Sequence, residues 1–255
     1  MIGVYDSGVG GLSVWKELAA LMPSQDYVYV ADSAHCPYGG KSPEYIVSRA
    51  DVIVRFLMDK GVEAVVVACN TATAAAISYL RSTFPIPFVG MEPAVKPAAL
   101  SSRTGVVGVL ATSNTFKGSL YRDTVMRYAS GVRVIEKVGV GLVEAVERAE
   151  VPSGLIRGYV GDMIGEGADV IVLGCTHFPF LEREIAEAAG GKARIINPAP
   201  AVARQARRIV GDKPVLDGRM PVRMFYSTGD TAVLRQMALS IDPALRPENF
   251  EHIDI

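Results

Sequence analysis

One pattern occurs twice in the chain, first as Gly61-Val-Glu-Ala-Val-Val-Val-Ala-Cys69 and again as Gly167-Ala-Asp-Val-Ile-Val-Leu-Gly-Cys175. Each copy is a run of mostly apolar residues of the length of one buried strand, and each ends in a cysteine. Nearly the same offset relates Ile2-Gly-Val-Tyr-Asp-Ser7 to Val107-Gly-Val-Leu-Ala-Thr112. Two segment pairs with matching spacing indicate two related halves, each carrying one thiol at the end of a strand.

Apolar, β-branched runs alternate with amphipathic helical patterns along the chain. Strands are expected at 2–5, 27–31, 64–68, 87–89, 105–110, 132–137, 170–174 and 194–196, and helices at 12–21, 43–60, 71–83, 115–128, 153–165 and 181–189. Strands that are apolar on both faces are typical of parallel sheets covered by helices on either side. The sequence therefore predicts an α/β fold.

The length of 255 residues allows two lobes. The Pro-rich stretch 85–97 is the expected crossing between the halves, and a second boundary is expected near Asn197-Pro-Ala-Pro200. The stretch from about 201 onward has no counterpart in a two-unit repeat. We expect it to add helix and strand to one lobe.

Composition excludes several classes of protein. The net charge is −1 and no block of basic residues is present, so nucleic acid is not an implied partner. No apolar run has the length of a membrane span, and the first residues do not form a signal peptide. The three cysteines, Cys36, Cys69 and Cys175, are too few for a disulfide framework, and reduced thiols favour a cytoplasmic protein.

Polar motifs follow the predicted strands, at the edge where parallel sheets bind ligands. They are Asp6-Ser7, Asp32-Ser33, Cys69-Asn70-Thr71, Thr112-Ser113 and Cys175-Thr176-His177. If the two halves face each other, Cys69 and Cys175 enter one cleft from opposite sides. That arrangement removes a proton from one face of a carbon and returns it to the other, which is the chemistry of a racemase.

A cysteine that acts as a base needs help to ionise, because its ordinary pKa is about 8.5. Each of these cysteines ends a strand and precedes a helix whose free N–H groups favour negative charge. Asn70, Thr71 and Thr176 add amide or hydroxyl donors. The alternative is that both cysteines are small buried apolar residues.

The loop Asp6-Ser-Gly-Val-Gly-Gly11 has part of a dinucleotide-binding fingerprint, but Ser13 replaces its third glycine. An aspartate before the turn repels a pyrophosphate, whereas it suits an ammonium group or a proton relay to a thiol. Glycines that only make a tight strand-to-helix turn are the simpler interpretation.

His177 lies two residues after Cys175, so it is a candidate proton-transfer partner for that thiol, or else a structural histidine. A metal site built from His35, Cys36 and these residues is not expected, because no close Cys-x-x-Cys or His-x-x-x-His pair is present. No lysine stands out as a site for a pyridoxal cofactor. We therefore expect neither a metal nor a cofactor.

Two further loops are candidates for binding a carboxylate, although a turn and a helix cap explain them equally well. In Pro37-Tyr-Gly-Gly40 the donors are backbone N–H groups and the Tyr38 hydroxyl. In the second half they are the hydroxyls of Thr112, Ser113 and Thr115.

Together these motifs resemble the glutamate racemases of the aspartate/glutamate racemase superfamily. The motifs that carry the resemblance are Asp6-Ser-Gly-Val-Gly-Gly11, Pro37-Tyr-Gly39, Ala68-Cys-Asn-Thr-Ala72 and Gly174-Cys-Thr-His-Phe-Pro179. The resemblance implies two pseudo-symmetric, flavodoxin-like α/β lobes with the active site in the cleft between them. It places residues 1–93 with 202–255 in the first lobe and 94–201 in the second.

The resemblance also implies cofactor-independent interconversion of L- and D-glutamate for peptidoglycan, by a homodimer. Cys69 takes the proton from the D-isomer with help from Asp6, and Cys175 takes it from the L-isomer with help from His177. The implied substrate-binding residues are Asp6, Ser7, Tyr38, Gly39, Asn70, Thr71, Thr112, Thr115, Thr176 and His177, with Glu147 as a further site residue.

The chain departs from the family pattern in two places. His35-Cys36 precedes Pro-Tyr-Gly, and 138–141 lacks the usual cysteine-proline before Glu147. Three other functions remain open: a racemase of aspartate or another small carboxylic acid, a two-lobed amino-acid-binding protein without catalysis, and a nucleotide-binding enzyme.

Overall fold

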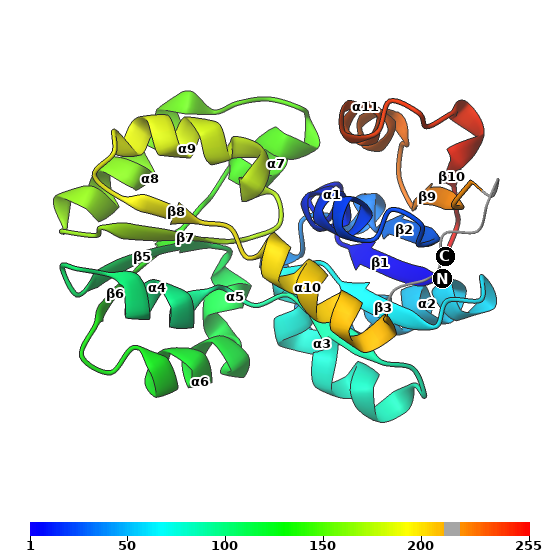
Figure 1. The fold of residues 1–255 in the computed structure, drawn as a ribbon, viewed down its shortest axis with the longest axis horizontal. Helices are drawn as coiled ribbons and strands as arrows, with labels where there is room; N and C mark the ends of the chain where they lie inside the picture. The colour runs from blue at the N-terminus through cyan, green and yellow to red at the C-terminus, as the bar shows by residue number, and fades with distance from the viewer. Residues whose placement is uncertain (212–219) are drawn as a thin grey trace.

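A computed structural model describes residues 1–211 and 220–255 of the chain. Within these residues the strands form two separate sheets, one of six strands and one of four, and every pairing is parallel. Helices lie around each sheet, and the two sheets belong to neighbouring parts of the molecule (Figure 1). The predicted two-lobed α/β fold is confirmed.

The first sheet has the order β10-β9-β2-β1-β3-β4. Its strands are β1 (Ile2–Asp6), β2 (Tyr27–Ala31), β3 (Ala64–Val67), β4 (Phe88–Gly90), β9 (Arg223–Ser227) and β10 (Phe250–His252). The residues of β1, β2 and β3 are all buried, because helices cover both faces. The C-terminal strands β9 and β10 extend the sheet beyond β2.

The second sheet has the order β6-β5-β7-β8. Its strands are β5 (Val106–Ala111), β6 (Arg133–Val138), β7 (Val170–Gly174) and β8 (Arg194–Ile196). Counted within each half, the order is second, first, third, fourth in both sheets. The sequence repeat is therefore also a repeat of topology, and β3 and β7 are equivalent strands.

Five of the predicted helix positions are occupied as expected, and α10 and α11 belong to the stretch from about 201 onward, for which helix was expected without positions. The helices are α1 (Leu12–Leu21), α2 (Pro43–Asp59), α3 (Asn70–Thr83), α4 (Val95–Ser101), α5 (Ser113–Lys117), α6 (Ser119–Tyr128), α7 (Leu142–Glu147), α8 (Ser153–Gly165), α9 (Glu182–Ala189), α10 (Ala199–Val210) and α11 (Ala232–Ile241). Short 3₁₀ turns occur at Ser33–His35, Tyr38–Gly40, Phe178–Leu181 and Pro247–Asn249. The single helix expected at 115–128 is two helices, because the chain turns to an extended conformation at Gly118, and α4 and α7 were not expected.

The chain passes between the sheets twice. It leaves the first sheet after β4 and reaches the second through α4, which begins in the Pro-rich stretch 85–97 and ends beyond it. It returns through α10, which packs against α1 (Figure 1).

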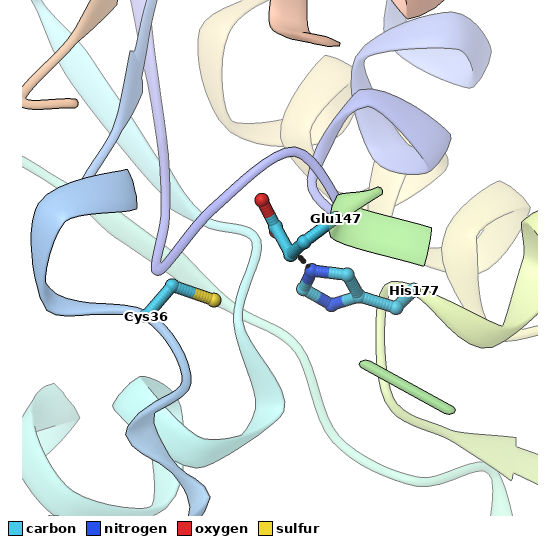
Figure 2. Close-up of side chains that lie close together, drawn as sticks. All are labelled: Cys36, Glu147 and His177. Carbon is cyan, nitrogen blue, oxygen red and sulfur yellow. Dashed lines mark hydrogen bonds and ion pairs between the residues drawn. The ribbon is translucent and has the colours of Figure 1, made fainter. Parts of the chain in front are cut away.

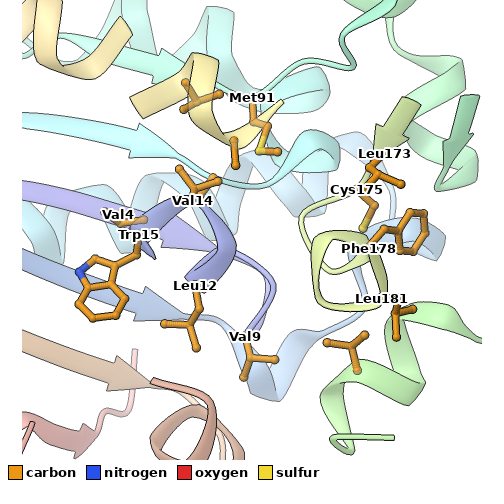
Figure 3. Packing of buried hydrophobic residues seen from close by; sticks show 14 of the residues in the cluster. Val4, Val9, Leu12, Val14, Trp15, Met91, Leu173, Cys175, Phe178 and Leu181 are labelled. Atoms are coloured by element: carbon orange, nitrogen blue, oxygen red, sulfur yellow. The ribbon is translucent and has the colours of Figure 1, made fainter. Parts of the chain in front are cut away.

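Buried apolar side chains continue from one sheet to the other. One cluster includes Leu12 and Trp15 of α1 together with Leu173 and Phe178 of the second half (Figure 3). The loops at the carboxyl ends of β1 and β7 therefore pack against each other. In the part of the chain that the structure describes, no helix is both long and apolar enough to cross a bilayer.

Candidate active site

The carboxyl ends of β3 and β7 face one small cavity between the two sheets. Its volume is about 10 Å³, and both Cys69 and Cys175 line it. The other lining residues are Ser7, Pro37, Tyr38, Gly39, Asn70, Thr71, Thr112, Val143, Thr176 and His177. Most of the residues expected to bind substrate are therefore gathered around the two thiols.

Cys69 caps the N-terminus of α3. Its sulfur accepts a hydrogen bond from the Ala72 N–H at 3.4 Å and lies 3.6 Å from the Ser7 hydroxyl oxygen. Burial and the nearby Asp6 carboxylate raise the pKa of the thiol to about 12, although the contacts with Ala72 and Ser7 favour the thiolate. In this closed cavity Cys69 is a protonated thiol at neutral pH.

Asp6, at the end of β1, is completely buried beside Cys69. Its carboxylate accepts a hydrogen bond from the Gly8 N–H at 2.8 Å and one from the Thr176 hydroxyl of the second half at 2.9 Å. Burial raises the pKa of Asp6 to about 6, even though the His177 charge and these hydrogen bonds lower it. A carboxyl group with this pKa can both accept and return a proton near neutral pH.

His177 lies on the other side of the cavity, where its Nδ1 is 3.7 Å from the Cys175 sulfur. Its Nε2 is 2.6 Å from a carboxylate oxygen of Glu147, the last residue of α7 (Figure 2). Burial lowers the pKa of His177, but the hydrogen bonds with Cys175, Cys36 and Glu147 outweigh burial and raise it well above its ordinary value. His177 is therefore a buried imidazolium between a thiol and a carboxylate.

Glu147 also connects the two lobes, because its Oε1 accepts a hydrogen bond from the Val9 N–H at 2.8 Å. Burial raises its pKa, but His177 and the Val9 N–H outweigh that effect and keep the pKa below its ordinary value. The ionised Glu147 thus holds the His177 ring and the first loop together.

Comparison with known proteins also indicates a racemase. A family model described as Asp/Glu/Hydantoin racemase matches residues 12–206. The chain belongs to this racemase family. It is 48% identical to the glutamate racemase of Methylococcus capsulatus over 91% of the chain and 88% of that protein, and 45% identical to that of Stutzerimonas stutzeri over 90% and 89%.

Solved structures of glutamate racemases share the whole fold. One from Bacillus anthracis has a TM-score of 0.85 at 29% identity, covering 100% of this chain and 97% of that one. One from Escherichia coli, in complex with L-glutamate and the activator UDP-MurNAc-Ala, has a TM-score of 0.84 at 32% identity, covering 98% and 96%. The chain is an amino-acid racemase by these relationships.

Steric contacts with the second lobe require glycine at two positions of the loop after β1 in this racemase. A Cβ on Gly8 would lie 1.9 Å from the Glu147 carboxylate, and one on Gly10 would lie 2.3 Å from Nδ1 of His177. Side chains of the second lobe fill the space that other residues would need. The partial dinucleotide fingerprint is therefore explained without a nucleotide.

The hydroxyl-rich loops meet at the cavity. Oγ1 of Thr71 is 2.8 Å from Oγ1 of Thr112, which is 2.9 Å from Oγ1 of Thr115. Ser113 donates a hydrogen bond to the Gly39 carbonyl oxygen at 2.9 Å. Thr115 is buried behind this chain of hydroxyls, outside the residues that line the cavity.

Only one of the two polar atoms of the Asn70 side chain makes a hydrogen bond within the part of the chain that the structure describes. Its amide nitrogen donates to the Met91 carbonyl oxygen at 3.3 Å, whereas its buried Oδ1 has no hydrogen-bond partner among the described residues. A buried acceptor without a partner costs free energy. It is therefore available to a donor group of a ligand.

Asp32, one of the polar residues that follow the predicted strands, holds the loop of Tyr38 in place, a role that the sequence does not predict. Its buried carboxylate accepts hydrogen bonds from the Tyr38 hydroxyl, from Arg49 at 2.8 Å and from Thr228 at 2.9 Å. Burial raises the pKa of Asp32, but Arg49, Tyr38 and His35 outweigh it and lower the pKa. Its position directly after β2, comparable to that of Asp6 at the end of β1, was the available signal.

Proposed function

We propose that this racemase interconverts L- and D-glutamate without a cofactor, by proton transfer at the α-carbon between two thiols. The observation that carries the proposal is that Cys69 and Cys175, from equivalent positions of the repeated halves, line one cavity. The glutamate racemases to which the chain is similar support the choice of substrate.

In the proposed reaction, the thiolate of Cys69 takes the α-proton of D-glutamate, and the Cys175 thiol protonates the opposite face. For L-glutamate the roles are reversed. Asp6 assists Cys69 by accepting its proton, and His177 stabilises the Cys175 thiolate as an imidazolium partner. Burial raises the pKa of Cys69, so the charge on the substrate ammonium group is needed to favour the thiolate.

The hydroxyl and backbone donors around the cavity suit the two carboxylates of glutamate. We propose that Ser7, Tyr38, Gly39, Asn70, Thr71, Thr112 and Thr176 bind the substrate directly and that Thr115 supports it through its hydrogen bond with Thr112. The unpaired Oδ1 of Asn70 accepts from the ammonium group. These donors stabilise the charge that develops on the α-carboxylate when the proton leaves.

The test is incubation of the metal-free, reduced protein with each isomer in D₂O, followed by circular dichroism and by the loss of the α-proton signal in NMR. Optical activity is expected to decay to zero from both sides with deuterium uptake. Cys69→Ser and Cys175→Ser are each expected to lower the racemisation rate by about 10²–10⁴-fold. Absence of exchange from either isomer would refute the assignment, and L-aspartate in the same assay tests the alternative substrate.

We also propose the setting in which the enzyme works. D-Glutamate is expected to supply peptidoglycan synthesis in the cytoplasm, where the three free cysteines would stay reduced. Residues 1–93 with 202–255 and residues 94–201 are proposed as the two domains, and a homodimer is proposed from the family resemblance. Light scattering of the purified protein tests the dimer.

A further inference from the structure

Cys36 is a thiol that the proposed reaction does not use. It follows β2 in the first lobe, is partly buried, and lies beside His177 and Glu147 of the second lobe (Figure 2). The Cys36 sulfur, a Glu147 carboxylate oxygen and a His177 nitrogen all lie within 4.8 Å of one another.

We propose that Cys36, Glu147 and His177 bind Zn²⁺ and that the bound ion inhibits the enzyme. Thiolate, imidazole and carboxylate are the three ligand types that zinc prefers, and three protein ligands leave a fourth position for water. Zinc bonds of about 2.0–2.3 Å place tetrahedral ligands about 3–4 Å apart. The three side chains therefore need only small rotations to enclose the ion.

The surroundings of the three side chains favour a metal ligand role. The Val9 N–H fixes the Glu147 carboxylate through Oε1, as a partner outside the metal shell would. The side chain of Glu147 is 20% exposed, which gives the ion a path from solvent, whereas that of His177 is 2% exposed. Binding displaces the thiol proton of Cys36 and the proton shared between His177 and Glu147.

The position of the ion gives two reasons for inhibition. It turns His177 from an imidazolium into a neutral, metal-bound imidazole, so Cys175 loses its charged partner, and it joins the first lobe to the second through Cys36. The cavity of about 10 Å³ between the thiols holds about one water and not an amino acid. An ion that ties the lobes together in this form excludes substrate, so zinc and glutamate oppose each other's binding. This consequence rests on the proposed function, whereas the metal site itself does not.

The binding test uses Co²⁺ as the probe on the reduced, full-length protein. Cobalt bound by a thiolate gives a near-ultraviolet charge-transfer band, and tetrahedral coordination gives intense visible bands. Both are expected in the unaltered protein. Cys36→Ser is expected to remove the charge-transfer band and to lower the affinity at least about tenfold. Cys69→Ser is the matched control, because it removes a neighbouring thiol outside the cluster and is expected to keep both bands.

The inhibition test adds Zn²⁺ to the D₂O exchange assay. Half-inhibition is expected to require more Zn²⁺ as glutamate increases, and at least about tenfold more Zn²⁺ in Cys36→Ser. No thiolate band in the unaltered protein, or an equal loss in Cys36→Ser and Cys69→Ser, would overturn the metal site. The cobalt spectra do not depend on activity, so a failure of the proposed reaction is distinguishable from a failure of this inference.

Discussion

Burial changes the pKa of Asp6 and thereby makes the stability of the protein depend on pH. The carboxyl group ionises near its ordinary pKa of 3.8 in the unfolded chain, whereas burial raises the pKa to about 6 in the folded protein. Between these pH values the folded state binds more protons than the unfolded state, so stability decreases as the pH rises. The difference corresponds to about 3 kcal/mol at pH 7.

Asp6→Asn has no carboxyl group to ionise, so it removes this pH dependence. The stability of the variant relative to the unaltered protein is expected to improve by about 2.5 kcal/mol between pH 4 and pH 7. Urea unfolding at several pH values in this range measures the difference. A difference that stays constant with pH would contradict the ionisation of a buried Asp6.

Glu147→Gln tests the charge on His177. The neutral amide keeps the shape of the side chain but removes a partner that raises the pKa of His177. The imidazolium is then lost at lower pH, so the fall in kcat on the alkaline side of the profile is expected to move to lower pH. The rate is expected to fall about tenfold, less than the 10²–10⁴-fold for a lost acid or base.

A pH–rate profile for both isomers checks this prediction. A loss of rate that is equal at every pH would instead indicate that Glu147 has only a structural role.

Among the helices, α5 and α6 are separated by Gly118, which packs against α3 of the other lobe. A Cβ at this position would lie 2.8 Å from the Ala74 Cβ, and neither carbon can move without the backbone. Gly118→Ala is therefore expected to lower the free energy of unfolding by about 1–3 kcal/mol.

Gly158→Ala is the matched control, because Gly158 lies inside α8 with open space around it. Its alanine variant is expected to gain about 0.5–1 kcal/mol from the lower entropy of the unfolded chain. Urea midpoints of the two variants give the comparison. A loss of stability in both, or in neither, would refute the packing argument.

The elements that were predictable from the sequence are those with a long, continuous pattern. The apolar strands β1, β3 and β7 and the amphipathic α2 are in this group. By contrast, α4 contains Pro97, and α7 has only six residues after a glycine. In both cases tertiary packing stabilises a helix that local propensity does not favour.

At the scale of the whole molecule, the lobes are held together over a cavity that is too small for the substrate. Asn114 of the second lobe donates hydrogen bonds to the carbonyl oxygens of Tyr38 at 3.1 Å and Lys41 at 2.8 Å. Ser13 of the first lobe donates to the Thr176 carbonyl oxygen at 2.8 Å. Such contacts must break for the site to admit glutamate, and they form again during catalysis.

Asn114→Ala removes two of these hydrogen bonds without touching either thiol. At about 0.5–1.5 kcal/mol each, their loss is expected to weaken closure by about 1–3 kcal/mol. A higher KM and faster hydrogen exchange of the 37–41 loop are expected. Thr124→Ala is the control, because that hydroxyl bonds only within α6, to the Leu120 carbonyl oxygen. Equal behaviour of the two variants would show that Asn114 does not govern closure.

The sequence predicts those site residues that lie near the ends of strands. Asp6 is the last residue of β1, and Cys69, Cys175 and His177 lie within three residues after the ends of β3 and β7, so parallel topology brings them to one edge. The contact between Cys36 and Glu147 depends on how the lobes pack against each other, and no local pattern encodes that packing.

The repeated halves place unlike partners beside their thiols, a carboxylate next to Cys69 and an imidazolium near Cys175. The enantiomers of glutamate nevertheless have the same free energy in water, so their equilibrium constant is unity at every pH. The Haldane relation then makes kcat/KM equal in the two directions. Whatever advantage in turnover the unequal partners give to one enantiomer must be matched by an equal increase in its KM.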